Sequence, residues 1–307
     1  MKRFPLLLIV LLTALGASCS SPSERVAALA ANGTQCGTSG QAGAPDDAGI
    51  AGDSGAADAG IDSGSDAGPP PPVAYAYMTL RAGQSDSGEQ ATFAGSPLDP
   101  WVPVPLVQYW HINSTRGITL TTFGPLGGKF GTELSNGKTL AAAGLPIKMS
   151  TVFISSTRCT AALPGNPGYN SALHLSITAM VTALPAGAFP VPLNLVFDNG
   201  QSDAQASNET QAAYFGCLNA INADLLTALP TGTRLHWVLH RTSIGPGGPL
   251  VPSLGNVNAS QDQFCAANDC SEVDTAPYAK QADGLHYTAE SDVAIGQLDA
   301  AASVAVP

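Results

Sequence analysis

The stretch VAYAYMTLRAGQSD, residues 73–86, joins an apolar run to a turn that ends in Gly-Gln-Ser-Asp. The same tetrapeptide ends a second apolar run, LNLVFDNGQSD, residues 193–203. Short apolar runs bounded by glycine-containing turns are typical of strands that are buried inside a parallel sheet. We therefore predict a central strand at each place, with a polar turn at its carboxyl end.

Strand-like and helix-like segments alternate along the rest of the chain. Apolar runs predict strands at 73–80, 118–123, 147–154, 193–197 and 234–239, of which the second is short and suits a sheet edge or hairpin arm. Apolar spacing predicts helices at 132–143, 170–184, 206–229 and 291–304. Cap residues at Asn208 to Thr210 and a stop at Pro230 mark the third of these helices. This alternation predicts an α/β fold, a three-layer α/β/α sandwich with a parallel sheet, whose ligands bind at the carboxyl ends of the strands.

The N-terminal residues have the composition of a targeting segment. Lys2 and Arg3 precede an apolar stretch of about a dozen residues, too short to span a bilayer, and small residues follow it, which predicts a secretory signal peptide at 1–18. Leu15-Gly16-Ala17-Ser18 before Cys19 resembles a bacterial lipoprotein cleavage box, although such boxes usually have leucine three residues before the cysteine. Two expectations follow: lipidation at Cys19, or plain secretion.

Residues 19–72 hold the lipid-anchor site and a low-complexity acidic tether of Gly, Ala, Asp and Ser that ends in prolines. Such a segment lacks the large apolar residues that offset the entropy of ordering. Residues 73–307 are long enough for one domain with a full core. The net charge of -11 argues against a nucleic acid or an anionic membrane as the partner. We expect an exported monomer, either an outer-membrane or cell-surface lipoprotein or a periplasmic or secreted protein, that contacts membranes only through an N-terminal lipid anchor.

The cysteines suit an exported chain, in which disulfides persist. Cys265 and Cys270 lie close together, in a segment that we interpret as a polar loop, and Cys159 and Cys217 form the natural second pair. Cys36 then remains in the tether, and spacing alone does not decide the connectivity. The sequence has neither CxxC spacing nor an HExxH motif, so we expect no metal or other cofactor.

A serine nucleophile needs a base, and the base needs a carboxylate that orients it. His286 lies in DGLHYTAESD, just before the last predicted helix, with Asp283 three residues earlier. This spacing can place the carboxylate against one imidazole nitrogen and leave the other nitrogen for a serine. The remaining histidines lie in loop, helix or strand contexts that favour structural roles: His111, His174, His236 and His240.

Four blocks of the sequence, in order, resemble the SGNH (GDSL-like) hydrolase superfamily and within it the sialate O-acetylesterase and acetylxylan esterase branch. AYMTLRAGQSDSG resembles the opening GQSN block, and FGTEL (130–134) resembles the second block. LVFDNGQSDA resembles the third block, usually written W-x-Q-G-E-S-D, and DGLHYT resembles the last block with its D-x-x-H motif. The resemblance implies a flavodoxin-like SGNH hydrolase fold and an esterase domain at 73–307.

The resemblance also implies roles for individual residues. Ser85 would be the nucleophile, with Asp283 and His286 completing the catalytic triad. The oxyanion hole would use the backbone N–H groups of Ser85 and Gly131 and the side-chain amide of Asn199, which replaces the third-block glutamine.

Two residues depart from the family pattern. Asp86 stands where the first block has asparagine, and Gln201 stands where the third block has glutamate. A carboxylate beside an oxyanion-forming serine is unfavourable unless it points away or pairs with Arg81. Ser202, in the second tetrapeptide, would be a turn and cap residue rather than a nucleophile.

The leading hypothesis is a serine esterase that removes acetyl or other small acyl groups from the hydroxyls of an acetylated carbohydrate. The alternative is a non-catalytic surface glycan-binding lipoprotein on a decayed esterase fold, which Asp86 and Gln201 support. A third hypothesis keeps the chemistry but takes acyl groups from lipids or thioesters. Three aromatic residues after the first block suit packing inside a loop, or else a sugar platform: Trp101, Tyr109 and Trp110.

Overall fold

The computed structural model describes residues 77–84, 90–112, 118–186, 188 and 191–304. The predicted signal peptide, the lipidation residue Cys19, the tether, Ser85 and Asp86 lie outside these residues. Of the helices that are described, none is long and apolar enough to cross a membrane.

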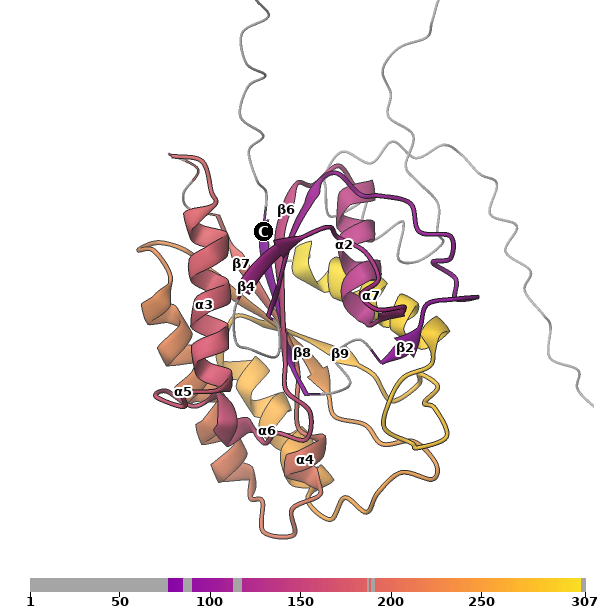
Figure 1. Cartoon of the computed structure of the whole chain (residues 1–307). Helices are drawn as coiled ribbons and strands as arrows, with labels where there is room; N and C mark the ends of the chain where they lie inside the picture. The colour runs from indigo at the N-terminus through magenta and orange to yellow at the C-terminus, as the bar shows by residue number, and fades with distance from the viewer. Residues whose placement is uncertain (1–76, 85–89, 113–117, 187, 189–190, 305–307) are drawn as a thin grey trace, which may run out of the picture.

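A seven-stranded sheet forms the centre of the described ranges (Figure 1). The strand order is β4-β3-β6-β1-β7-β8-β9, and every neighbouring pair is parallel except the antiparallel edge pair β3 and β4. A separate small ladder joins β2 to β5. The strands are β1 (Tyr77–Gly83), β2 (Ala91–Thr92), β3 (Val107–Ile112), β4 (Ile118–Thr121), β5 (Lys129–Phe130), β6 (Ile147–Phe153), β7 (Leu193–Asp198), β8 (Leu235–Arg241) and β9 (Cys270–Asp274).

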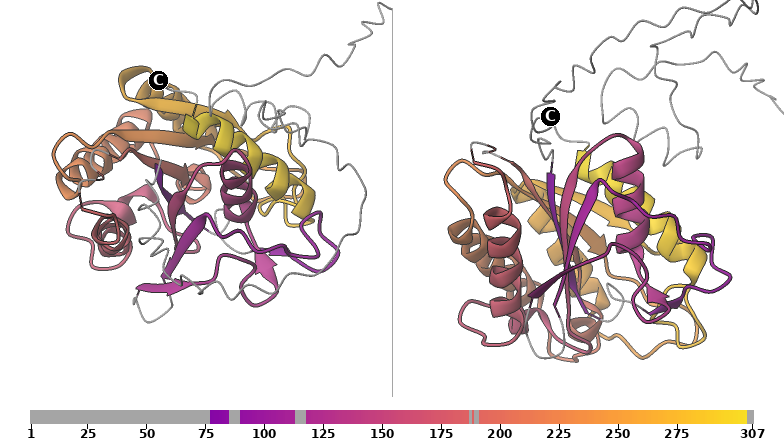
Figure 2. Two further views of the ribbon diagram at one scale, coloured as in Figure 1. Left: turned by 90° about the horizontal axis from the view of Figure 1, so that it is seen from above. Right: turned by 45° about the horizontal axis from the view of Figure 1, so that its top comes forward.

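Helices cover both faces of the sheet and make three layers (Figures 1 and 2). One face carries α2 (Thr132–Ala142) and α7 (Ala289–Val304), which pack against each other. The other face carries α3 (Tyr169–Thr182), α5 (Gln211–Ala228) and α6 (Leu254–Ala267). The short α4 (Gln201–Ala204) follows β7, and a 3₁₀ turn, η2 (Cys159–Ala162), precedes α3. The predicted α/β/α sandwich is confirmed.

The central strands are buried because helices cover them on both sides. All six residues of β7 are buried, as are six of the seven in β1. The Trp237 ring of β8 packs edge-on against the rings of Phe197 and of Phe264 in α6, with distances of 5.3 and 4.8 Å between ring centroids. Burial on both faces explains why these strands read as continuous apolar runs rather than as alternating ones.

The sheet register brings the first two residues of the first tetrapeptide, Gly83 and Gln84, beside the second tetrapeptide. Gly83 pairs with Asp198 at the end of the β1–β7 ladder, and the Gln84 N–H donates to the Asp198 carbonyl oxygen at 3.0 Å. The Gln84 side-chain oxygen accepts the Ser202 N–H at 3.3 Å. Gly83 and Gln84 therefore lie beside the turn after β7 at the carboxyl edge of the sheet.

The expected loop after the first block is partly a strand. Residues 107–112 form β3, with Tyr109 and Trp110 buried in the sheet. Trp101 donates its indole N–H to the Phe123 carbonyl oxygen at 3.1 Å and packs edge-on against the Phe123 ring. These aromatic residues pack inside the protein, so Tyr109 and Trp110 do not form an exposed sugar platform.

Two further boundaries differ from the sequence prediction. Cys265 and Cys270 do not lie in a polar loop, because the first belongs to α6 and the second begins β9. The helix predicted at 206–229 begins only at Gln211, since the Thr210 side chain caps it by accepting the Ala213 N–H at 3.2 Å. A cap residue has non-helical backbone angles, so the residues before it lie outside the helix.

Both expected disulfides are present. Cys159–Cys217 ties η2 to α5, and Cys265–Cys270 ties α6 to β9. The bonded residues are 58 positions apart in the first and 5 apart in the second. Because a cross-link restricts the unfolded chain more when it closes a longer loop, the first should contribute more stability.

We expect the pair of changes Cys159→Ala and Cys217→Ala to lower the free energy of unfolding by about 4 kcal/mol, and Cys265→Ala with Cys270→Ala to lower it by about 2 kcal/mol. Urea unfolding of both variants under oxidising conditions measures the difference. An equal loss in the two variants would contradict the loop-length argument.

Candidate active site

The loop between β9 and α7 carries the D-x-x-H motif. The ring atom Nδ1 of His286 lies 2.6 Å from Oδ2 of Asp283, whose other oxygen accepts the backbone N–H groups of Leu285 and His286 at 2.9 and 3.0 Å. The Asp283 side chain is part-exposed, with 44% of its surface accessible, and that of His286 is mostly covered. The Nε2 atom of His286 is buried and has no hydrogen-bond partner among the described residues. The structure thus brings the expected acid–base pair together and leaves the second ring nitrogen open.

The charge state of Asp283 suits an orienting role. Partial burial would by itself raise its pKa, but the hydrogen bonds from the His286 ring and from two backbone N–H groups outweigh this and lower the pKa below its usual value. An ionised carboxylate can only accept hydrogen bonds, so Nδ1 must carry the proton. This arrangement selects the tautomer whose Nε2 is a free acceptor.

Glycine backbone holds this loop in place. The Gly245 N–H donates to the Gly284 carbonyl oxygen at 2.8 Å. Gly284 has φ +66°, and a Cβ there would lie 2.5 Å from Cα of Gly248. A Cβ on Gly248 would lie 2.5 Å from Cγ2 of Ile244 and 3.0 Å from the Gly284 carbonyl oxygen. The loop after β8 and the D-x-x-H loop therefore approach more closely than any side chain would permit.

A cavity of about 210 Å³ lies between the loop after β8 and the residues that follow β9. Lys280 on its wall places Nζ 3.3 Å from the centroid of the Tyr287 ring, directly after His286 in the chain. The volume of the cavity is below roughly 300 Å³, the lower end of the range for ligand pockets, so the cavity suits one small chemical group of a ligand. The lining residues are Ser243, Ile244, Gly245, Pro246, Ala276, Pro277, Tyr278, Ala279 and Lys280.

Asn199 follows directly after β7 and is 1% exposed. Its side-chain nitrogen Nδ2 donates to the Thr157 carbonyl oxygen at 3.4 Å, while its Oδ1 has no partner in the part of the chain that the structure describes. The second hydrogen of Nδ2 therefore remains available at the carboxyl edge of the sheet. Asn199 directly follows Asp198, whose carbonyl oxygen accepts the Gln84 N–H.

The Gly131 N–H already has a hydrogen-bond partner. Gly131 precedes α2, and its N–H donates to the Glu133 side chain at 2.9 Å. Glu133 is 2% exposed and lies in the first turn of the helix, where a carboxylate is favoured. The N–H group that the family resemblance assigns to the oxyanion hole is thus already bound to a carboxylate in this structure.

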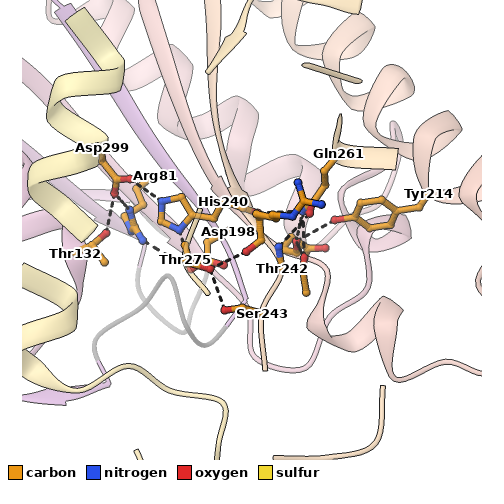
Figure 3. A network of polar contacts seen from close by, with 12 residues as sticks. Arg81, Thr132, Asp198, Tyr214, His240, Thr242, Ser243, Gln261, Thr275 and Asp299 are labelled. Carbon is orange, nitrogen blue, oxygen red and sulfur yellow. Dashed lines mark hydrogen bonds and ion pairs between the residues drawn. The ribbon is translucent and has the colours of Figure 1, made fainter. Parts of the chain in front are cut away.

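A buried ionic network beneath these turns was not predicted from the sequence (Figure 3). Asp299 of α7 accepts from Arg81 Nη1 at 2.8 Å and from the Thr132 hydroxyl at 3.1 Å. His240 of β8 places Nε2 2.6 Å from Asp299 Oδ1 and Nδ1 3.3 Å from Asp198 Oδ2. Arg81 Nη2 lies 4.0 Å from the same Asp198 oxygen. We refer to Arg81, Thr132, Asp198, His240 and Asp299 as the ionic cluster.

The charges of the ionic cluster stabilise one another. Burial would lower the pKa of His240, but Asp299 and Asp198 together raise it to about 9. Burial would raise the pKa of each aspartate, but His240 and Arg81 lower both. The imidazole is therefore charged at neutral pH, and its contribution to stability is complete below its unfolded pKa of about 6.5 and is lost as pH rises through about 9.

Two other histidines pair with aspartates away from this edge. His174 Nε2 lies 2.7 Å from Asp224 Oδ2, and His236 Nδ1 lies 2.7 Å from Asp269 Oδ1. Within the described ranges, no group of three or more histidine, cysteine, aspartate or glutamate side chains has the arrangement of a metal site.

Asp203, in the second tetrapeptide, is a buried carboxyl group. It is 1% exposed and accepts the Cys159 N–H at 3.0 and 3.2 Å. Burial raises its pKa to about 7, although the Cys159 N–H acts in the opposite direction. The folded protein therefore favours the protonated form, whose stabilising effect is complete below about pH 3.8 and is lost as pH rises through about 7.

The fold is similar to that of several solved structures, one of which is a carbohydrate acetylesterase. No family model matches the sequence, and a search of curated proteins finds no match. A protein from Arabidopsis thaliana aligns with a TM-score of 0.54 and 14% identity over 75% of this chain and 98% of its own. A carbohydrate acetylesterase from Xanthomonas citri aligns with a TM-score of 0.50 and 15% identity over 73% of this chain and 55% of its own, so this chain spans about half of that protein. NanS aligns with a TM-score of 0.50 and 13% identity over 74% of this chain and 97% of its own. The described residues thus share the three-layer α/β fold of these structures, which agrees with the fold that the four blocks predicted.

The close approach of Gly248 to the Gly284 backbone gives a stability prediction. Gly248→Ala should lower the free energy of unfolding by about 1 to 3 kcal/mol, because the new methyl group overlaps Ile244 and the Gly284 backbone. Gly255→Ala, in α6 with nothing within 4 Å of the new Cβ, is the matched control and should change stability by less than about 1 kcal/mol. Equal unfolding midpoints for the two variants would show that the loops can move apart without cost.

The buried carboxyl gives a pH prediction. Asp203→Asn keeps an acceptor for the Cys159 N–H but cannot ionise. The change that it causes in the free energy of unfolding should therefore be more favourable at pH 8 than at pH 5, by about 2 to 4 kcal/mol. Urea unfolding at the two pH values measures this. Asp274→Asn, on the surface at the end of β9, is the control and should show no such difference. A pH-independent effect of Asp203→Asn would contradict the raised pKa.

Proposed function

We propose that the protein is a serine esterase that removes acetyl or other small acyl groups from carbohydrate hydroxyls. The observation that supports this best is the Asp283–His286 pair, in which an ionised carboxylate orients the ring and Nε2 is buried without a partner among the described residues. A general base with this geometry needs only a hydroxyl within reach of Nε2. The fold supports the class, because a carbohydrate acetylesterase shares it.

The proposed reaction proceeds through an acyl-enzyme. The Ser85 hydroxyl oxygen attacks the ester carbonyl carbon while His286 Nε2 takes the hydroxyl proton. The imidazolium then gives this proton to the departing sugar oxygen, and the acyl group remains on Ser85. His286 next removes a proton from water, whose oxygen attacks the acyl carbonyl carbon. The imidazolium then returns this proton to the Ser85 oxygen as the bond to the acyl group breaks, which releases the carboxylic acid and restores the serine hydroxyl. Asp283 stabilises the charged ring throughout, and the mechanism uses no metal or organic cofactor.

The proposed oxyanion hole combines the Ser85 N–H with the Asn199 side-chain amide. A donor aimed at the developing charge is worth about 3 kcal/mol of transition-state stabilisation. Gly131 would contribute a third donor when the Glu133 carboxylate releases its N–H. The cavity of about 210 Å³ next to the D-x-x-H loop would hold a single acyl group or part of one sugar ring.

The location follows from the sequence prediction. We propose an exported enzyme whose signal peptide is removed and whose acidic tether links the domain to a lipid on Cys19. Acetylated polysaccharides outside the cell would then be in reach of a domain held at the membrane surface.

The competing proposal is a surface lipoprotein that binds glycans without cleaving them. The bond between the Gly131 N–H and Glu133 favours it, because a carboxylate occupies a group that an oxyanion would need. The two proposals differ in a single measurable property, which is release of the acyl group.

The test is acetate release from a chromogenic acetyl ester and from acetylated xylan by the full chain. Ser85→Ala and His286→Ala should each lower kcat by about 10³-fold or more, because the triad acts as a unit. Ser202→Ala, the equivalent serine of the second tetrapeptide, is the matched control and should stay within about threefold of the parent. Asp86→Asn should raise kcat, because it removes a negative charge beside the forming oxyanion.

Two outcomes would contradict these assignments. Loss of activity in Ser202→Ala but not in Ser85→Ala would place the nucleophile in the second tetrapeptide. A parent that binds acetylated glycans but releases no acetate from any ester would favour the non-catalytic alternative.

A further inference from the structure

The backbone carbonyl of Asn199 receives an unusual number of hydrogen bonds for a turn residue. The Tyr214 hydroxyl donates to this oxygen at 3.0 Å, the Thr242 hydroxyl at 3.2 Å, and the Gln261 side-chain nitrogen at 3.3 Å. Figure 3 shows these side chains converging from separate elements: Tyr214 from α5, Gln261 from α6 and Thr242 from the residue directly after β8. A backbone carbonyl has two lone pairs, so three donors saturate it and fix its direction.

The donors also bind one another. Gln261 Nε2 lies 3.1 Å from the Thr242 hydroxyl and 3.0 Å from the His240 carbonyl oxygen, while its Oε1 accepts the Thr242 N–H at 3.0 Å. Gln261 and Tyr214 are both fully buried. The side chains are therefore held in one arrangement before any substrate is present.

The next residue must be glycine for this arrangement to form. Gly200 has φ +131°, and a Cβ there would overlap the Thr242 hydroxyl and lie 2.9 Å from Cγ1 of Val257 and 3.1 Å from the Tyr214 hydroxyl. The turn after β7 is thus pressed against the three donors.

The Asn199 side chain at this turn is not satisfied by the protein. Its Nδ2 donates one of its two hydrogens, in a long bond to the Thr157 carbonyl oxygen, and the second hydrogen has no acceptor among the described residues. The side chain is 1% exposed, and its Oδ1 also lacks a partner there. A buried amide without its hydrogen bonds is unfavourable, and groups of this kind often serve a ligand or a reaction.

We propose that Tyr214, Thr242 and Gln261 are positioning residues that fix the Asn199 backbone and thereby aim its side-chain amide at the oxyanion of the acyl transfer. This inference rests on the proposed function and deepens it. A donor contributes most when it is held in place before charge develops, because no reorganisation is then needed during the reaction. Helices α5 and α6, on one face of the sheet, would in this way fix the direction of the Asn199 amide in the turn after β7.

Tyr214→Phe is the most conservative test, since it removes only the hydroxyl. Tyr109→Phe is the matched control: it removes a buried hydroxyl that bonds Thr151 in the β3–β6 part of the sheet. We expect Tyr214→Phe to lower kcat for the chromogenic acetyl ester about tenfold with KM unchanged, and Tyr109→Phe to leave kcat within about twofold. Both should lose similar stability in urea unfolding, so a fall in kcat would not reflect unfolding.

A double-mutant cycle with Asn199→Ala separates positioning from a general structural effect. Asn199→Ala keeps the backbone carbonyl and the Tyr214 hydrogen bond but removes the amide. If Tyr214 acts through that amide, Tyr214→Phe should change kcat by less than about twofold in the Asn199→Ala background. A tenfold fall in both backgrounds, or no fall in the parent, would overturn the positioning role alone. A parent without esterase activity would overturn the proposed function and this role together.

Discussion

The buried pairing of Arg81 and His240 with Asp198 and Asp299 is the interaction on which the arrangement of the candidate site depends. Removing one partner from a buried ion pair costs about 3 to 5 kcal/mol, because the other charge then lacks compensation. The ionic cluster takes one residue from each of β1, β7, β8 and α7 and adds Thr132 from α2. It therefore holds three central strands and two helices together at the carboxyl edge, where the two tetrapeptide turns begin.

The site above this cluster is assembled by backbone rather than by long side chains. The first turn is bonded to the end of β7 through the Gln84 N–H, and the D-x-x-H loop is bonded to the loop after β8 through Gly245 and Gly284. Because these hydrogen bonds join backbone groups directly, the register of the sheet fixes where the loops with the candidate catalytic residues begin. This explains why a parallel sheet can carry a site made from the ends of several strands.

Several elements were predictable because their signals are local. The central strands read as apolar runs, Asp283 and His286 are three residues apart, and the cysteines offered a natural pairing. The missed helix α6 does have helical spacing on its buried face, but two of its four buried residues are polar: Val257, Ser260, Gln261 and Phe264. The missed strand β9 lies at the sheet edge and buries only Val273, so it has too little apolar pattern to be recognised.

The sequence by itself determined the α/β/α class, the order of the four blocks and the Asp283–His286 pair, since each depends on neighbouring residues or on repeated local patterns. Only the tertiary structure decided that Arg81 binds Asp299, 218 positions away, and that Gln261 binds the Asn199 carbonyl, 62 positions away. Contacts across such separations depend on how the layers pack, and burial makes these polar groups find partners that no local pattern specifies.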